Sequence, residues 1–217
     1  MIKTTTLSIF LSLLVSLSVS GQEKSRFGLK AGVNVAWQSH QQKDDRHVPL
    51  VSMHFTGYTE VQLTERLFLQ PGLSLQGKGL SVDAKGYMDG SDGKVHMLYL
   101  EIPVNLLYKL KVADFGTLIM GGGPYAGLGL MGSIFDRSEN VFRNFEGSNG
   151  YGNTDYGLNL SLGTQLNSRL TLTLQQSIGL DNVAPEAYTI PGPADEPMVI
   201  KGNIKNRVAS VSLGFRF

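Results

Sequence analysis

The chain has 217 residues and no cysteine, with 41% hydrophobic residues, 17% charged residues and a formal net charge of +1. This length fits a single all-β domain, and the absence of cysteine excludes disulfide bonds and thiolate metal sites. The near-neutral charge argues against a nucleic-acid partner, and the hydrophobic fraction is too low for a helical membrane protein.

The first 21 residues have the pattern of a secretory signal peptide. Lys3 gives a positive start, an apolar run follows from Leu7 to Val19, and Ser20 and Gly21 are small residues suited to a cleavage site. A transmembrane helix needs about 20 apolar residues, so this run is too short for one. We therefore predict a signal peptide over residues 1–21 and one domain over residues 22–217.

The first predicted strand runs from Phe27 to Trp37, where large apolar residues alternate with small or polar ones. Side chains of a strand alternate between its two faces, so the apolar residues share one face. Phe27 and Trp37 lie on that face. Their separation corresponds to roughly 25 Å of climb in a tilted strand, which matches the apolar band of an outer-membrane barrel between its aromatic girdles.

Seven further segments alternate in the same way, so the sequence predicts eight strands in total. Polar or glycine-rich stretches separate them, alternately long and short. Pro71 lies inside one segment and lacks a backbone donor, so we expect a local bulge there. The seven segments are residues 51–63, 67–76, 98–108, 116–130, 155–166, 170–175 and 206–217, and the long loops are 38–49, 77–95, 132–153 and 181–205.

This pattern predicts an eight-stranded antiparallel up-and-down transmembrane β-barrel with short periplasmic turns and long extracellular loops. A soluble barrel can have the same strand number with its apolar face inward. On a soluble barrel the other face would meet water and carry Lys and Glu. Here the other face is mostly Gly, Ser, Thr, Asn and Gln, which suits a narrow lumen. We therefore predict an integral protein of the bacterial outer membrane.

The last strand ends on an aromatic residue, which is typical of the segment that the outer-membrane assembly machinery reads. Val211, Leu213, Phe215 and Phe217 alternate with small or polar residues, so we expect them to face lipid, with Arg216 in the lumen. We expect this strand to pair with the first one and close the barrel. The predicted periplasmic girdle and assembly signal consist of Phe27, Tyr108, Phe215 and Phe217.

Five charged residues point into the lumen on this register: Lys30, Glu60, Glu101, Asp155 and Arg216. An eight-stranded barrel is just wide enough to be filled by side chains, and a buried charge is costly unless it is paired. We therefore interpret these residues as a structural charge network and expect Glu101 to approach Lys30 or Arg216. The alternative is a catalytic pair of carboxylates, Glu60 and Glu101, which a substrate would have no way to reach.

Other patterns that could mark a site are weak, and we predict no catalytic, cofactor or metal site. The spacing of His40, His47, His54 and His96 fits no known ligand pattern. Ser52 with His54 could imitate the Ser and His of an eight-stranded lipid-modifying enzyme. Apolar residues in the loops either form a binding surface or pack over the barrel mouth: Phe135, Phe142, Phe145, Tyr151, Tyr188, Ile190, Met198, Val199 and Ile200.

Short blocks spread along the chain resemble the PorT-like outer-membrane β-barrel proteins common in Bacteroidetes. The resemblance implies an outer-membrane barrel, and the member that names the family takes part in a protein secretion apparatus. It brings no catalytic motif. The blocks are Phe27 to Asn34, Leu69 to Leu73, Lys78-Gly79, Tyr99 to Pro103, Gly123 to Tyr125, Asp155 to Gly157, Gly179-Leu180, Asn206-Arg207 and Gly214 to Phe217.

The sequence thus supports four hypotheses on function. The first is a non-enzymatic barrel with a filled lumen, whose loops or periplasmic rim bind another envelope or extracellular protein. The second, from the resemblance, is an accessory part of a protein secretion or envelope-assembly machine. The third is a lipid-modifying enzyme at the outer rim, and the fourth is a narrow channel. The expected partners are outer-membrane lipid, the assembly machinery and an unidentified protein, and no cofactor is expected.

Overall fold

The computed structural model describes residues 25–39, 47–82, 93–112, 116–134, 142, 152–183, 187–191, 197–201 and 204–217. The predicted signal peptide lies outside these ranges and remains a prediction. Among the described residues, no helix is long and apolar enough to cross a membrane.

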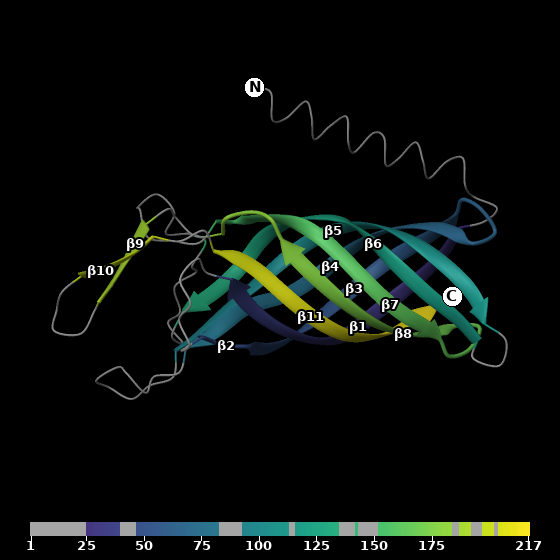
Figure 1. Ribbon diagram of the computed structural model, residues 1–217, viewed down its shortest axis with the longest axis horizontal. Coiled ribbons are helices and arrows are strands. Elements are labelled where there is room, and N and C mark those ends of the chain that lie inside the picture. Colours follow the sequence, from purple (N-terminus) through teal and green to yellow (C-terminus); the bar gives the residue numbers. More distant parts are fainter. Residues whose placement is uncertain are drawn as a thin grey trace, which may run out of the picture.

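Eight long strands form one closed antiparallel barrel (Figure 1). Each strand pairs with its neighbours in the chain, and the first strand pairs with the last, as the alternation predicted. The eight strands are β1 (Ser25–Ser39), β3 (Leu50–Gln62), β4 (Leu67–Val82), β5 (Gly93–Val112), β6 (Gly116–Ile134), β7 (Thr154–Gln165), β8 (Leu170–Gly179) and β11 (Lys205–Arg216).

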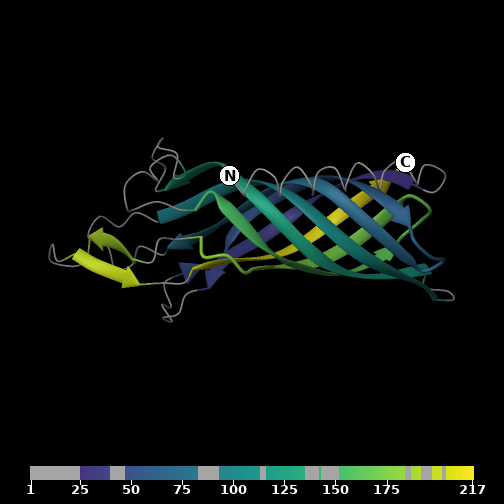
Figure 2. The ribbon, with the colours of Figure 1, turned by 90° about the horizontal axis from the view of Figure 1, so that it is seen from above.

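The barrel closes where β1 meets β11, and Figure 2 shows the strands tilted around the barrel axis. Gly28 lies opposite Arg216, and the backbone N–H of Phe217 donates to the carbonyl of Phe27 at 2.9 Å. The two ends of the barrel chain therefore meet at one end of the barrel. We call it the turn end, because the tight turns 63–66 and 166–169 lie there, and we call the opposite end the loop end.

The two faces of the wall have the predicted polarity. Met53 on β3 is 75% exposed and Leu213 on β11 is 56% exposed, whereas Asn34 on β1 is fully buried and Glu101 on β5 is 2% exposed. Apolar side chains outside and polar side chains inside are the arrangement of a membrane barrel, since the wall meets lipid. The soluble alternative would require the reverse.

Three details differ from the sequence-based expectation. Strands β4 and β5 continue through most of the predicted loop 77–95, because Gly77 lies opposite Leu98 and Val82 lies opposite Gly93. Gly79 interrupts the pattern without ending the strand: its φ is +138°, and a Cβ there would meet the carbonyl of Val95. That glycine explains why the segment reads as a loop.

The bulge predicted at Pro71 is wrong. Pro71 lies opposite Val104 in β5, and the register is the same on both sides of it. The register shifts instead between β5 and β6, next to Leu98 and Tyr99. Pro71 is tolerated because no residue of β3 is paired with it.

The structure also contains short strands that the sequence did not predict. β2 (His47–Val48) pairs with the outer part of β4. β9 (Ala187–Pro191) and β10 (Pro197–Lys201) form a separate two-stranded hairpin inside the predicted last loop. Figure 1 shows this hairpin beyond the loop end of the barrel.

Two tyrosines fill the lumen by lying over glycines of the neighbouring strand. Tyr58 lies opposite Gly28, and Tyr125 lies opposite Gly157. A Cβ on either glycine would clash with the tyrosine ring, so these positions require glycine for close approach. Aromatic rings placed over glycines also hold the register of neighbouring strands.

Candidate functional site

The lumen of the barrel holds buried charged side chains in two clusters, one near each end. We call them the loop-end cluster (Lys78, Glu101, Asp155) and the turn-end cluster (Glu60, Lys109, Arg216). A belt of neutral polar side chains lies between them. The candidate residues predicted from the sequence lie in this interior.

The loop-end cluster is built around one lysine. Lys78 Nζ lies 2.5 Å from Glu101 Oε1 and 2.7 Å from Asp155 Oδ2, and all three side chains are almost fully buried. Lys78 Nζ also lies 4.4 Å from the ring centre of Tyr125, a cation–π contact. Asn206 Nδ2 donates to Asp155 Oδ2 at 2.9 Å. Four strands thus converge on one cation, which offsets the cost of burying it.

An apolar cap covers the loop-end cluster on its outer side. Its members are Leu80, Val95, Met97, Tyr99 and Phe142, and the ring of Phe142 meets Tyr99 edge-on at 5.4 Å. Phe142 is therefore a lid residue, one of the two alternatives that the sequence left open for the loop aromatics. Phe135, Phe145 and Tyr151 lie outside the described residues.

The turn-end cluster is built around one carboxylate. Glu60 Oε2 lies 2.6 Å from Lys109 Nζ and 3.5 Å from Arg216 Nη1. Gln70 Nε2 donates to Glu60 Oε1 at 3.2 Å, and Lys109 Nζ lies 4.3 Å from the ring centre of Phe68. The Arg216 side chain is 14% exposed, so this cluster lies closer to water than the loop-end cluster does.

Hydrogen-bonded neutral side chains fill the middle of the lumen. His54 Nδ1 meets Asn34 Oδ1 at 2.7 Å, and Asn34 Nδ2 donates to Gln76 Oε1 at 3.0 Å. The hydroxyls of Thr56 and Ser74 lie 2.6 Å apart. These neutral hydrogen bonds satisfy several buried polar groups of the belt, whereas Asn105 Oδ1 and Ser212 Oγ have no hydrogen-bond partner among the described residues.

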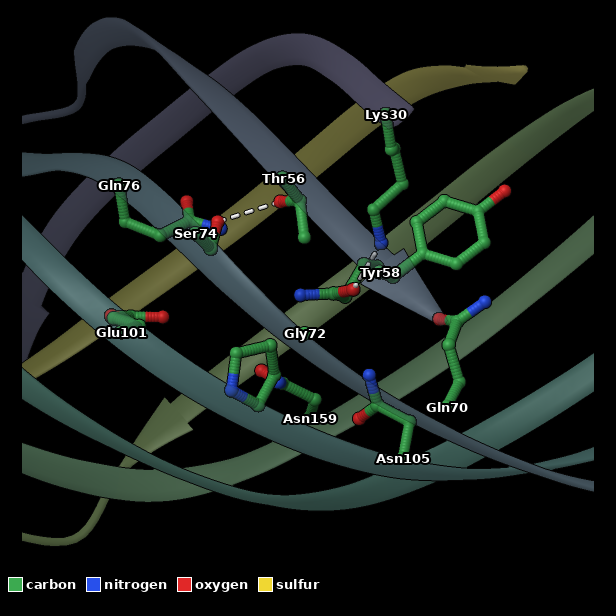
Figure 3. A pocket seen from close by; sticks show the side chains of 12 residues that line it. Lys30, Thr56, Tyr58, Gln70, Gly72, Ser74, Gln76, Glu101, Asn105 and Asn159 are labelled. Atoms are coloured by element: carbon green, nitrogen blue, oxygen red, sulfur yellow. Dashed lines mark hydrogen bonds between the residues drawn. The ribbon is translucent and has the colours of Figure 1, made fainter. Parts of the chain in front are cut away.

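A polar cavity of about 10 Å³ lies in this belt (Figure 3). That volume is roughly the space of one water molecule. Lys30 points into it and donates to Gln175 Oε1 at 3.4 Å. No carboxylate pairs with Lys30 among the residues that the structure describes.

The structure divides the five predicted lumen charges. Glu101 and Asp155 share Lys78, Glu60 and Arg216 meet at the turn end, and Lys30 stays apart. The expected partner of Glu101 is therefore corrected: its ion pair is with Lys78, not with Lys30 or Arg216. Glu60 and Glu101 belong to different clusters, so the geometry gives no support to a catalytic carboxylate pair.

Sequence reasoning missed Lys78 and Lys109, the partners of the three lumen carboxylates. Lys78 was assigned to the glycine-rich loop 77–95, and Lys109 lay just beyond the predicted strand 98–108. Alternation could have found both, since Lys78 continues the inward series of Gln76 and Lys109 continues that of Leu107.

Ser52 and His54 are not hydrogen-bonded to each other. Ser52 Oγ donates to the carbonyl of Gly77 at 2.7 Å, and His54 is buried against Asn34. No group of three or more His, Cys, Asp or Glu side chains could hold a metal ion within the described part of the chain. The predicted girdle residues are all exposed on the outer face, where Phe27 and Phe217 stack at 5.9 Å and Phe215 meets Phe217 at 5.1 Å.

Residues 10–184 match the family model described as outer membrane protein beta-barrel domain. The chain belongs to this family. Together with the closed eight-stranded barrel, this match makes the protein an integral outer-membrane protein. No curated protein sequence matches the chain.

Solved structures of other barrels resemble this one only in fold. Neisserial surface protein A is 11% identical, with a TM-score of 0.47 over 88% of this chain and 97% of that chain. Ail, the attachment invasion locus protein of Yersinia pestis, is 10% identical, with a TM-score of 0.44 over 89% and 99%. The outer membrane protein AlkL is 11% identical, with a TM-score of 0.43 over 89% and 90%.

Proposed function

We propose that this small outer-membrane barrel is neither a channel nor an enzyme, and that it binds another envelope or extracellular protein through its loop end. The observation that carries the proposal is the filled lumen. The charges of the two clusters are paired, Lys30 is hydrogen-bonded to Gln175, and the polar cavity between the clusters has a volume of only about 10 Å³. Because the wall faces lipid and side chains fill the lumen, the surfaces at the two ends of the barrel remain available for binding.

The hairpin of β9 and β10 supports binding at the loop end. Its pairing places Tyr188 opposite Ile200 and Ile190 opposite Met198. An isolated two-stranded hairpin is marginally stable in water, so one rich in apolar residues gains stability when a partner covers it. The unpaired edges of β9 and β10 can also extend a partner's sheet by backbone hydrogen bonds.

We infer a finer assignment to the PorT-like group within the family, and with it a second candidate function in a protein secretion or envelope-assembly machine. The blocks that carry this resemblance lie far apart in the sequence. Several of them supply the loop-end cluster and its neighbours: Lys78, Tyr99, Glu101, Tyr125, Asp155 and Asn206. Their convergence in space supports a shared architecture with the group, and the secretion role rests on the resemblance.

Planar-bilayer recordings test the filled lumen. We expect purified, folded protein to give no unitary conductance steps at moderate voltage, because both clusters block the path. A variant in which Lys78, Glu101 and Asp155 are all replaced by Ala removes one of the two blocks, and any conductance that it gains measures the share of the loop-end cluster in closing the lumen. Regular steps from the wild-type protein would contradict a closed lumen.

Cross-linking on intact cells tests binding at the loop end. The wild-type chain is compared with a variant in which residues 187–201 are replaced by a Gly-Ser linker of the same length. We expect a partner captured by the wild type to be lost from this variant. A matched control replaces residues 113–115, which follow β5 in the sequence, and should keep the partner. Identical capture by all three proteins would refute the role of the hairpin.

A further inference from the structure

Two turns at the turn end share the sequence pattern Gln-Leu-x-x-Arg-Leu. Gln62 to Leu67 reads Q-L-T-E-R-L, and Gln165 to Leu170 reads Q-L-N-S-R-L. The first joins β3 to β4 and the second joins β7 to β8. Because these hairpins are four strands apart in a barrel of eight, the two turns lie on opposite sides of the wall.

The two turns also have the same hydrogen bonds. The side chain at the third position accepts from the backbone N–H of the last leucine, at 3.1 Å from Thr64 Oγ1 to Leu67 and 2.8 Å from Asn167 Oδ1 to Leu170. The first leucine donates its N–H to the carbonyl of the last, at 2.9 Å in both turns. Side-chain oxygens of Thr and Asn stabilise turns in this way.

In each turn, the leucine that follows the arginine lies opposite an outward-facing aromatic residue. Leu67 lies opposite Tyr108, and Leu170 lies opposite Phe215. Arg66 Nη1 donates to the Tyr108 hydroxyl at 3.4 Å, so its guanidinium lies toward the lipid side of the wall. Both arginine carbonyls accept a backbone N–H from the neighbouring strand, Arg66 from Lys109 and Arg169 from Arg216.

The leucines that begin the two turns are exposed. Both lie at the rim of the barrel, where Leu63 is 50% exposed and Leu166 is 56% exposed. An exposed leucine followed three residues later by an exposed arginine, beside an aromatic ring, matches the boundary between acyl chains and headgroups. The leucine suits the apolar side and the arginine suits the phosphate side.

The exposed charges at this end are mostly positive. Of the described residues there, Arg26, Arg66, Lys111 and Arg169 are exposed cations, and Glu65 is the exposed anion. Basic residues at a membrane surface attract anionic lipids, and arginine binds phosphate oxygens through paired N–H groups. The exposed cations and the exposed leucines both fit an anionic phospholipid.

We propose that Arg66 and Arg169 are two equivalent binding sites for the phosphate of anionic phospholipid headgroups, in the leaflet that surrounds the turn end. The sequence predicts that this end is periplasmic. The leucine of each turn contacts the acyl chains, and the neighbouring aromatic residue, Tyr108 or Phe215, lies at the interface. The barrel therefore holds headgroups at two opposite points of its rim.

Lipid selectivity in vesicles tests this proposal. The protein is reconstituted in phosphatidylcholine, and electron spin resonance compares the association of spin-labelled phosphatidylglycerol with that of spin-labelled phosphatidylcholine. One basic residue near an anionic lipid surface gives a factor of about five. We expect the wild type to prefer phosphatidylglycerol about fivefold. The preference should fall to within about twofold in the double variant Arg66→Gln, Arg169→Gln.

Two further variants separate the site from total charge and from folding. Arg66→Lys with Arg169→Lys keeps the cations and should keep most of the preference. Lys94→Gln with Lys205→Gln removes two cations from the loop end and should keep all of it. A heat-dependent gel shift verifies that each variant is folded. A wild type without preference, or an equal loss in the loop-end variant, would overturn the proposal.

Discussion

The two charge clusters of the lumen have opposite charge patterns. At the loop end one cation, Lys78, is shared by two carboxylates, and at the turn end one carboxylate, Glu60, is shared by two cations. The first is sealed under an apolar cap, and the second lies near the barrel mouth. Loss of an ion pair should therefore cost more free energy of unfolding at the loop end than at the turn end, because burial decides how much an unpaired charge costs.

Replacing Lys78 by Met should have the largest effect on stability. It leaves Glu101 and Asp155 buried together without a cation, and breaking a buried ion pair in this way costs about 3–5 kcal/mol. Unfolding in urea, followed by the fluorescence of the single tryptophan, Trp37, measures the loss. The exposed Lys94→Met is the matched control and should change stability little.

A triple variant sharpens this result. Adding Glu101→Gln and Asp155→Asn to Lys78→Met removes the unpaired charges and should restore much of the lost free energy, since neutral replacements of buried ion pairs are often tolerated. If Lys78→Met were as stable as Lys94→Met, the loop-end cluster would contribute nothing to the fold.

Replacing Glu60 by Gln should have a smaller effect, about 1–3 kcal/mol, because Arg216 is partly exposed and keeps its hydrogen bond to the carbonyl of Ser168. The two cations then repel each other, so part of the loss should disappear at high salt. Urea unfolding at low and high ionic strength measures both. Glu65→Gln, in the exposed turn, is the control, and equal losses in the two variants would argue against the turn-end cluster.

Deleting Phe217 should have the smallest effect on stability and a large effect on assembly. The deletion removes the stacking of Phe217 on Phe27, worth about 1 kcal/mol. It also removes the terminal aromatic that we expect the assembly machinery to read. The amount of folded protein in outer-membrane fractions should fall several-fold, while urea unfolding of the purified variant changes little. Normal membrane levels would contradict the assembly role.

Alternation allowed most of the wall to be predicted from the sequence. Each face of β1, β3, β5, β7 and β11 follows from a period of two, because lipid and a narrow lumen select opposite kinds of side chain. The ends of β4 and β5 were missed, since Gly79 and the polar residues after it resemble a loop although backbone pairing continues. Outside the apolar band, the ends of a strand depend on its pairing with neighbouring strands. The residue pattern of one strand carries no information about that pairing.

The inward charges were predicted more easily than their partners. The alternation of side chains along each strand places Glu60, Glu101 and Asp155 inside the barrel. The ion-pair partner of each, however, depends on the stagger between strands that are far apart in the chain. Lys78 reaches Asp155 across a separation of 77 residues, and Lys109 reaches Glu60 across 49. The Leu-x-x-Arg-Leu repeat was visible in the sequence, but its meaning required the matching hydrogen bonds and the opposite positions of the two turns.

The opposite charge patterns of the two clusters give the lumen a fixed electric dipole along the barrel axis. With all groups ionised, the loop-end cluster has one excess negative charge and the turn-end cluster has one excess positive charge. An anion that enters from the loop end and a cation that enters from the turn end are both repelled by the first cluster they meet. By charge, the plug therefore opposes anions at the loop end and cations at the turn end, and by packing it blocks the path of both.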